Sequence, residues 1–204
     1  QWHHLPETNG IPLCCDMTSD LLTREFDVND YSMIYASAQK NMGIAGITFV
    51  IMKRDMIGQS NNLIPTMTDY KTYADTRSFY NTPPTFPWYV MLLVLRWVKA
   101  QGGVAAIQAT NQAKSSQLYN EVDQSDFYLN KVDPACRSEG NVPVWLQDEA
   151  LNALFLKASA EAGLKALKGH MAVGGMRASI YNAVPLAGIE ALIAFMKEFE
   201  RTNG

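Results

Sequence analysis

Two side chains of opposite charge follow candidate strands near the start of the chain. Asp16 ends a short apolar run over 12–16, and Lys40 follows a second apolar run over 31–36 and precedes a turn of small residues over 43–46. Ligands of open α/β sheets bind just beyond the carboxyl ends of strands. A carboxylate and an amine at neighbouring strand ends could therefore face one pocket. The alternative is that both are ordinary turn residues, since Lys and Asp are common at strand ends.

A second candidate ligand site lies where a helix is expected to begin. The run Asn81-Thr82-Pro83-Pro84 precedes an apolar stretch that reaches about residue 100 and stops at Gly102-Gly103. Asn and Thr are favourable helix caps, and proline is tolerated in the first helical turn, so we predict that Asn81 and Thr82 cap this helix. The free N–H groups at a helix N-terminus also bind anions.

The elements that would position these residues are those of an α/β chain. Strands are predicted over 12–16, 31–36 and 47–52, and the last two are continuous apolar runs, which is typical of strands covered on both faces. Residues 58–81 show no period, which predicts a long loop. Helices are predicted from about 81 to 100 and from 104 to 123.

After residue 124 the pattern changes to a smaller α+β unit. A strand is predicted over 142–146, a helix over 148–164, a short strand at 180–181 and an amphipathic helix over 185–201. We therefore predict the latter part of an α/β large domain over 1–124, with a mostly parallel sheet and flanking helices, and a small C-terminal α+β domain over 125–204.

The composition of the chain limits the classes of binding partner that can be expected. Hydrophobic residues make up 48% of the chain and charged residues 18%, and the net charge of −3 gives no electrostatic support to a nucleic-acid or anionic-membrane partner. The longest apolar run, 88–95, is too short to cross a bilayer, and no secretory signal is expected at the N-terminus. Three cysteines predict buried free thiols in a reducing compartment, the cytoplasm, and no spacing favours a metal site.

Three motifs occur in a fixed order along the chain. They are the segment from Asp16-Met17-Thr18-Ser19 to Ala38-Gln39-Lys40-Asn41, the run Asn81-Thr82-Pro83-Pro84-Thr85-Phe86, and the run Gly174-Gly175-Met176-Arg177-Ala178-Ser179-Ile180-Tyr181-Asn182. Together they resemble the phosphoserine aminotransferase family, within the class V, fold-type I aminotransferases that depend on pyridoxal phosphate. The resemblance covers nearly all residues from Asp16 onward but only the C-terminal part of the family's enzyme, so we expect half of the cofactor site to be missing.

The resemblance implies a role for each of several residues toward the cofactor. Lys40 would carry pyridoxal phosphate as a Schiff base and move the substrate proton, and Asp16 would pair with the pyridinium nitrogen. Gln39 would contact the cofactor phosphate. Thr8, in a run that matches the family only imperfectly, would donate to the phenolic oxygen. Asn81 and Thr82 would reach the cofactor phosphate of a partner subunit, which implies a homodimer.

The resemblance also implies the substrates. The family transfers the amino group between phosphoserine and 2-oxoglutarate, giving 3-phosphohydroxypyruvate and glutamate in serine biosynthesis. Arg177 would hold the substrate carboxylate with its two-donor guanidinium, and His170 would help to bind the substrate phosphate. Met171 stands where the family has Arg, and a thioether cannot pair with a phosphate. This departure predicts weaker phosphoserine binding or a changed substrate.

Two other readings stay open from the sequence. The chain could be a catalytically silent fragment or degenerate homologue that acts only as a dimeric interaction protein. It could also be a module that binds a phosphate ligand through the helix at Asn81 and through Arg177, without covalent chemistry.

Overall fold

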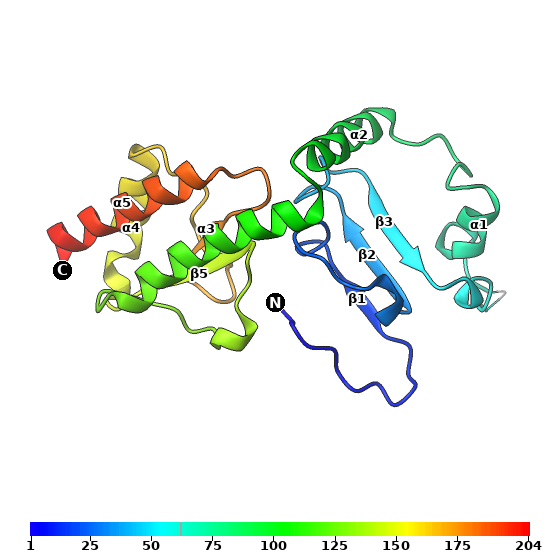
Figure 1. The fold of residues 1–204 in the computed structure, drawn as a ribbon, viewed down its shortest axis with the longest axis horizontal. Helices are drawn as coiled ribbons and strands as arrows, with labels where there is room; N and C mark the ends of the chain where they lie inside the picture. The colour runs from blue at the N-terminus through cyan, green and yellow to red at the C-terminus, as the bar shows by residue number, and fades with distance from the viewer. Residues whose placement is uncertain (62) are drawn as a thin grey trace. The chain divides into compact units, whose positions relative to one another are not determined.

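The computed structural model describes residues 1–61 and 63–204, which divide by their contacts into two units (Figure 1). One unit consists of residues 4–103, and the other of residues 1–3 and 104–204. Each unit has its own sheet and its own hydrophobic cluster, so each is described by itself.

The unit of residues 4–103 is built on a three-stranded sheet in the order β1-β2-β3. β1 runs parallel to β2, and β2 runs antiparallel to β3, so this sheet is mixed and not mostly parallel as predicted. The strands are β1 (Cys14–Asp16), β2 (Met33–Ser37) and β3 (Thr48–Met52), and the helices are α1 (Tyr70–Asp75) and α2 (Thr85–Ala100).

Only one face of this sheet is well covered. Ile34 and Ala36 are buried and cluster with Met91 of α2, whereas Tyr35 between them points to the other face and is 37% exposed. The predicted strands covered on both faces are therefore wrong for this unit. The prediction of buried thiols is also wrong, because Cys14 is exposed and Cys15 and Cys136 are half-buried.

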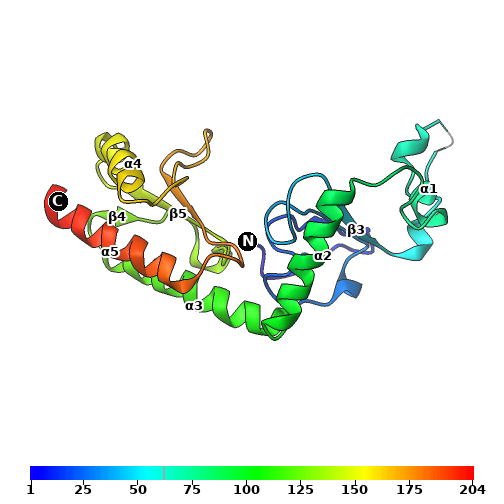
Figure 2. The same ribbon diagram turned by 90° about the horizontal axis from the view of Figure 1, so that it is seen from above.

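The unit of residues 1–3 and 104–204 has a second sheet, in the order β4-β5-β6, with both strand pairs antiparallel. Helices α3 and α5 lie side by side in both ribbon views (Figures 1 and 2). The elements are α3 (Val104–Gln124), β4 (Tyr128–Leu129), β5 (Asn141–Leu146), α4 (Asn152–Glu161), β6 (Met176–Ser179) and α5 (Leu186–Asn203).

The core of this second unit follows from helical and strand periodicity. α5 buries Ile189, Leu192, Met196 and Phe199, which recur at the spacing of one helix face. These side chains pack with Val142 and others on the inner face of β5 and with aromatic rings from α4 and β4. The helices therefore cover one face of this sheet, and its second face is left for other contacts.

The boundary between the units differs from the predicted one. α3 contacts β4, β5 and α5, so by packing it belongs with the residues that follow it and not with residues 4–103. The predicted division at residues 124 and 125 separated α3 from these partners, because it was set by the change in residue pattern that follows this helix.

Most predicted elements are confirmed, with three local corrections. α2, α3, β5 and α5 lie within a few residues of their predicted positions. The predicted loop over 58–81 contains α1, the helix predicted over 148–164 ends at Glu161, and the last strand is Met176–Ser179 instead of 180–181.

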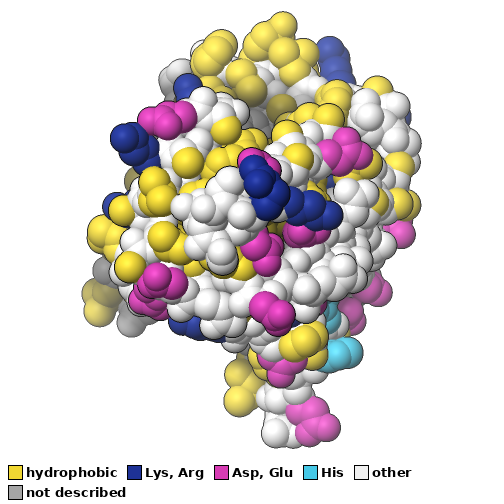
Figure 3. All heavy atoms as spheres, turned by 90° about the vertical axis from the view of Figure 1, so that its left-hand side faces the viewer, with side chains coloured by type: hydrophobic (Ala, Val, Ile, Leu, Met, Phe, Trp, Pro, Cys, Tyr) yellow, Lys and Arg dark blue, Asp and Glu magenta, His cyan; other side chains and the backbone are white. Residues whose placement is uncertain are grey.

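The described residues include no single helix long and apolar enough to cross a membrane, although α2 and α3 taken together meet that length and composition. On the face drawn in Figure 3, Lys and Arg side chains are interspersed with Asp and Glu, so no patch of one charge gathers on that face.

Candidate functional site

The parallel pairing of β1 with β2 brings two predicted site residues to one sheet edge. Asp16, the last residue of β1, pairs with Tyr35, and β2 ends two residues later at Ser37. Lys40 therefore lies in the turn that leaves the same edge, next to Gln39. Asp16 and Gln39 are exposed and Lys40 is half-buried, so all three can meet a ligand that approaches this edge.

Hydrogen bonds join the turn after Asp16 to the turn that holds Lys40. The Thr18 N–H donates to Asp16 Oδ1 at 2.8 Å, which orients the carboxylate. The Ser37 N–H donates to Thr18 Oγ1 at 3.2 Å, and the buried Asn41 amide donates to the Ser19 carbonyl at 3.4 Å. These bonds tie together the two turns that carry Asp16, Gln39 and Lys40 at the same end of the sheet.

A largely buried ion pair supports the segment that follows Asp16. Arg24 Nη2 lies 2.8 Å from Asp20 Oδ2, with both side chains 16% exposed, and Thr23 Oγ1 donates to the Asp20 carbonyl at 2.6 Å. Burial opposes the charge on Arg24, but the hydrogen bond and charge of Asp20 outweigh it and raise the pKa of Arg24. Burial, with the charges of Asp20 and Asp16, raises the pKa of the Cys15 thiol, which disfavours its nucleophilic thiolate form.

The turn after Lys40 is anchored on the first turn of α2. Gly46 has φ +121°, and a Cβ at this position would lie 3.1 Å from Pro87 Cγ. A larger residue would therefore both strain the backbone and press on the helix. The close approach fixes the turn that begins at Lys40 against α2.

The predicted cap of α2 is corrected by the structure. The helix begins at Thr85 with Pro84 as its N-cap, and Pro84 makes no side-chain hydrogen bond to the first N–H groups. Asn81 and Thr82 lie before it, exposed, and Asn81 Nδ2 donates to the Thr82 carbonyl at 3.2 Å. The first turn of α2 therefore keeps backbone donors for a ligand, which is the property that an anion requires.

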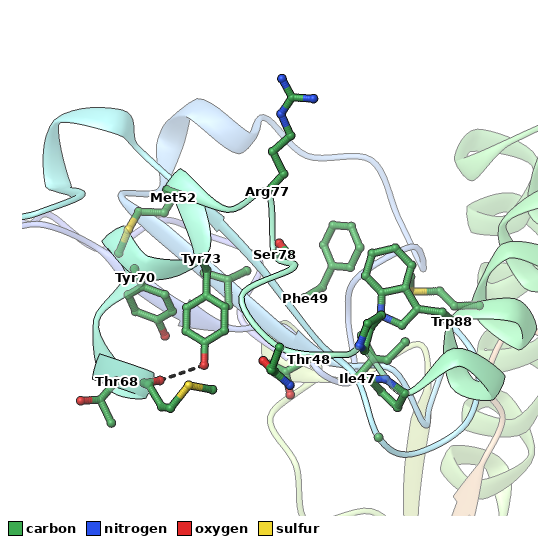
Figure 4. A pocket seen from close by; sticks show the side chains of 18 of the residues that line it. Ile47, Thr48, Phe49, Met52, Thr68, Tyr70, Tyr73, Arg77, Ser78 and Trp88 are labelled. Carbon is green, nitrogen blue, oxygen red and sulfur yellow. Dashed lines mark hydrogen bonds between the residues drawn. The ribbon is translucent and has the colours of Figure 1, made fainter. Parts of the chain in front are cut away.

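A cavity of about 1040 Å³ lies beside the outer edge of β3 (Figure 4). Aromatic rings line it, among them Phe49, Tyr73 and Trp88, and the Tyr73 hydroxyl donates to the Met67 carbonyl at 2.9 Å. Asn81 also lines this cavity, whereas Lys40, Gln39 and Asp16 do not. The cavity is thus separate from the polar edge that carries Lys40.

Thr8 lies in a turn before β1. Its carbonyl accepts the Ile11 N–H at 2.9 Å, and the residue is half-buried. The structure places its backbone in this turn, and the role of its hydroxyl stays a prediction.

The other two predicted site residues belong to a hairpin of the second unit. The Gly169 N–H donates to the Gly175 carbonyl at 3.0 Å, and the Arg177 N–H to the Leu167 carbonyl at 2.7 Å. These bonds join the two legs of a hairpin, residues 167–169 and 175–177. His170 lies beyond Gly169, at the tip of the hairpin, and Arg177 lies at its base, on β6. Both side chains are exposed, and His170 Nδ1 accepts the Ala172 N–H at 3.2 Å. The hairpin thus carries both side chains, with His170 at its tip and Arg177 at its base.

Met171 follows His170 at the tip of this hairpin and is 96% exposed. An apolar side chain in this position gains nothing from burial and offers no charge to an anion. The exposed position of Met171 is therefore consistent with the prediction that phosphoserine lacks a cationic contact at this residue.

A buried lysine that the sequence analysis did not single out supports the segment after β6. Lys114 is fully buried, and its ammonium donates to the carbonyls of Ile180, Tyr181 and Val184, each at 3.0 Å. Burial lowers the pKa of Lys114 to about 8. The sequence feature that could have indicated its burial is its spacing. Lys114 lies seven residues after Ile107 and four before Leu118, on the buried face of α3.

No arrangement of three or more His, Cys, Asp or Glu side chains suited to a metal ion occurs in residues 1–61 and 63–204. The predicted chemical groups in the described residues are Lys40 with Asp16 on the first sheet, and Arg177 with His170 on the hairpin.

Comparison with known proteins groups the chain with one family of relatives. A family model described as aminotransferase class-V matches residues 3–192. Phosphoserine aminotransferases from Pseudomonas aeruginosa and Bacillus cereus are each 50% identical over 98% of this chain. The match covers 55% of each relative, so the chain spans about half the length of the curated relatives it matches.

Solved structures resemble the whole chain. The phosphoserine aminotransferase from Bacillus circulans subsp. alkalophilus has a TM-score of 0.96 at 45% identity, covering 100% of this chain and 57% of its own. The phosphoserine aminotransferase from Trichomonas vaginalis, bound to pyridoxal phosphate, has a TM-score of 0.91 at 34% identity, covering 97% of this chain and 56% of its own. An alanine–glyoxylate aminotransferase from Nostoc sp., at 16% identity and a TM-score of 0.78 over 93% of this chain and 54% of its own, shares the α/β fold alone.

Proposed function

The chain belongs to the aminotransferase class-V family, and we propose that it works as a phosphoserine aminotransferase, exchanging an amino group between phosphoserine and 2-oxoglutarate with pyridoxal phosphate as cofactor. The observation that carries this proposal is the shared sheet edge of Asp16 and Lys40, held together through Thr18 and Asn41. Relatives at 50% identity that are named phosphoserine aminotransferases support the choice of phosphoserine as a substrate.

The donor set at the sheet edge suits pyridoxal phosphate. Bound pyridoxal phosphate supplies an electron sink for the substrate's α-carbon. Lys40 offers a primary amine for the cofactor aldehyde and a base that can take a proton at Nζ from the substrate Cα. Asp16, whose Oδ1 already accepts from Thr18, offers a carboxylate that holds a proton on the ring nitrogen. Gln39 supplies a neutral polar group for the phosphate.

The hairpin of the second unit supplies the substrate contacts in this proposal. Arg177 is exposed on β6, and its planar guanidinium matches the two oxygens of an α-carboxylate. His170, at the tip, binds the substrate's phosphate side. Met171 beside it adds no charge, so phosphoserine binding relies on fewer cationic contacts.

The uncapped start of α2 supports a role in the cofactor site of a second subunit. The N-cap residue Pro84 makes no side-chain cap bond to its first N–H groups, and Asn81 and Thr82 are exposed just before it. In our proposal these groups bind the cofactor phosphate of a partner copy, so that the enzyme is a homodimer, and it works in the cytoplasm.

Covalent trapping tests the proposal most directly. The protein is incubated with pyridoxal phosphate, reduced with borohydride and digested, and the modified lysine is located by mass spectrometry. We expect the cofactor on Lys40, its loss in Lys40→Ala, and its retention in Lys53→Ala, a matched change at an exposed lysine just after β3. Saturating cofactor that leaves Lys40 unmodified would overturn the enzyme proposal. Phosphate-ligand binding without a covalent label would instead point to a binding module.

A further inference from the structure

Trp145 is buried, but it is not part of the hydrophobic core of its unit. It is 4% exposed, yet the core cluster includes its neighbours Val144 and Leu146 and not Trp145 itself. Side chains alternate along a strand, so Trp145 points to the face of β5 opposite that core. Something on this second face must cover the ring.

The hairpin of residues 167–177 provides that cover. Pro143 of β5 pairs with Arg177 of β6, and Val144 pairs with Met176, so the register places Trp145 on the same sheet face as Arg177 and beside Gly175. Trp145 Nε1 donates to the Val173 carbonyl at 3.4 Å. This is a long hydrogen bond, so packing of the ring supplies most of the contact.

Gly175 shows how closely the hairpin lies on the ring. It has φ +63°, and a Cβ added there would lie 2.7 Å from Trp145 Cδ1 and 2.7 Å from the Val144 carbonyl oxygen. Only glycine permits this approach. The ring also has the Lys131 ammonium 5.2 Å from its centroid, and Lys131 in turn lies 3.7 Å from Glu149. Trp145 is thus enclosed by the hairpin and by a charged side chain.

We propose that Trp145 is a positioning residue for substrate binding: its indole ring supports the hairpin and thereby fixes His170 relative to Arg177. The inference rests on the proposed function, because that function gives His170 and Arg177 their substrate. Without the ring, the tip loses its base of support while the bonds between the two legs remain. Substrate affinity then falls, and the chemistry at Lys40 is untouched.

The test compares Trp145→Phe and Trp145→Leu with wild type. Phe keeps a ring and loses the N–H donor, and Leu loses both. We expect amide hydrogen exchange over 169–177 to become faster in the order wild type, Phe, Leu. We expect the KM for phosphoserine to rise about tenfold in the Leu variant, the factor for one lost polar contact, with kcat and cofactor trapping at Lys40 unchanged.

A core variant separates positioning from loss of stability. Phe155→Leu weakens the unit from the opposite face of the sheet, since Phe155 is 2% exposed within the core cluster. It should lower the melting temperature without changing hairpin exchange or KM. Equal effects of Phe155→Leu on KM, unchanged hairpin exchange in the Trp145 variants, or a fall in kcat that matches the rise in KM would each overturn the proposal.

The test also covers a Trp145→Leu variant that does not fold and a wild type that does not trap the cofactor. If Trp145→Leu does not fold, Trp145→Phe against wild type decides the matter on the same two measurements, and unchanged exchange or KM overturns the proposal. If wild type fails to trap cofactor at Lys40, the proposed function fails, while hairpin exchange still decides whether Trp145 supports the hairpin.

Discussion

Lys114→Met should destabilise the unit of residues 104–204. The ammonium of Lys114 is fully buried and donates to three carbonyls, those of Ile180, Tyr181 and Val184. A hydrogen bond to a charged group contributes about 1.5–3 kcal/mol, so the substitution removes about 4.5–9 kcal/mol of interaction. It also leaves three buried acceptors without their donor.

Part of this loss is recovered because Met has no charge to bury. Burial lowers the pKa of Lys114 from 10.5 to about 8, which corresponds to about 3 kcal/mol of opposition to the charged form. The difference predicts that the free energy of unfolding falls by about 1.5–6 kcal/mol.

Urea unfolding followed by Trp145 fluorescence measures this change. Replacing Trp2, Trp88 and Trp97 by Phe leaves Trp145 as the only fluorescent tryptophan, so the signal reports the unit that contains Lys114. Lys157→Met, at a side chain 75% exposed, is the matched control and should change stability by less than about 0.5 kcal/mol. A Lys114→Met variant as stable as this control would refute the reasoning.

The same lysine gives the unit a pH dependence of known sign. Because the folded pKa of Lys114 lies below its unfolded value, the unfolded chain binds more protons between about pH 8 and pH 10.5. The contribution of Lys114 to the unfolding free energy therefore rises with pH across this window and is flat below it. We expect the stability difference between wild type and Lys114→Met to widen from pH 8 to pH 10. A difference that narrows would contradict the assignment.

Two other predictions concern the site residues and their supports. Met171→Arg should lower the KM for phosphoserine about tenfold, because an exposed tip residue can add a charged contact without a clash, and equal KM values in Met171→Arg and the neutral Met171→Gln would count against it. Asp20→Asn should lower stability by about 1–3 kcal/mol in urea unfolding and slow cofactor trapping at Lys40, because it breaks a largely buried pair with Arg24. The exposed Asp55→Asn serves as its control, and the same loss in both variants would show that the Asp20 pair does not support the site.

Strong local signals explain which elements the sequence could predict. α2 begins after two prolines and ends where Gly103, at φ +84°, donates to the Val98 carbonyl at 3.0 Å, as a helix C-terminus requires. α1 was missed because its composition is that of a loop. Its only local signals are the Asp69 side chain that caps it and the Lys71–Asp75 pair one turn apart.

Burial depends on tertiary contacts that no single run of residues encodes. Continuous apolar runs predicted two covered faces for β2, but only the face of Ile34 and Ala36 receives α2. On α3, Asn111 and Lys114 are buried although both are polar. Asn111 donates to Asn182 at 2.8 Å and Lys114 to the segment beside it, so their burial depends on partners about 70 residues away.

The residues with reactive or binding side chains differ from the residues that position them. Gln39 and Lys40 lie between the buried Ala38 and Asn41, and His170 follows Gly169, whose added Cβ would meet the carbonyl oxygens of the opposite hairpin leg. Motifs identify lysine, arginine and histidine by their reactive groups. Among the supports, Gly46, Gly169 and Gly175 act by letting two segments come close, whereas Lys114 and the Arg24–Asp20 pair act through charged hydrogen bonds. Close approach depends on two segments that are distant in the sequence, so it can be seen only in the fold. Substitutions at the supporting residues should therefore alter the affinity for the substrate without altering the reacting groups.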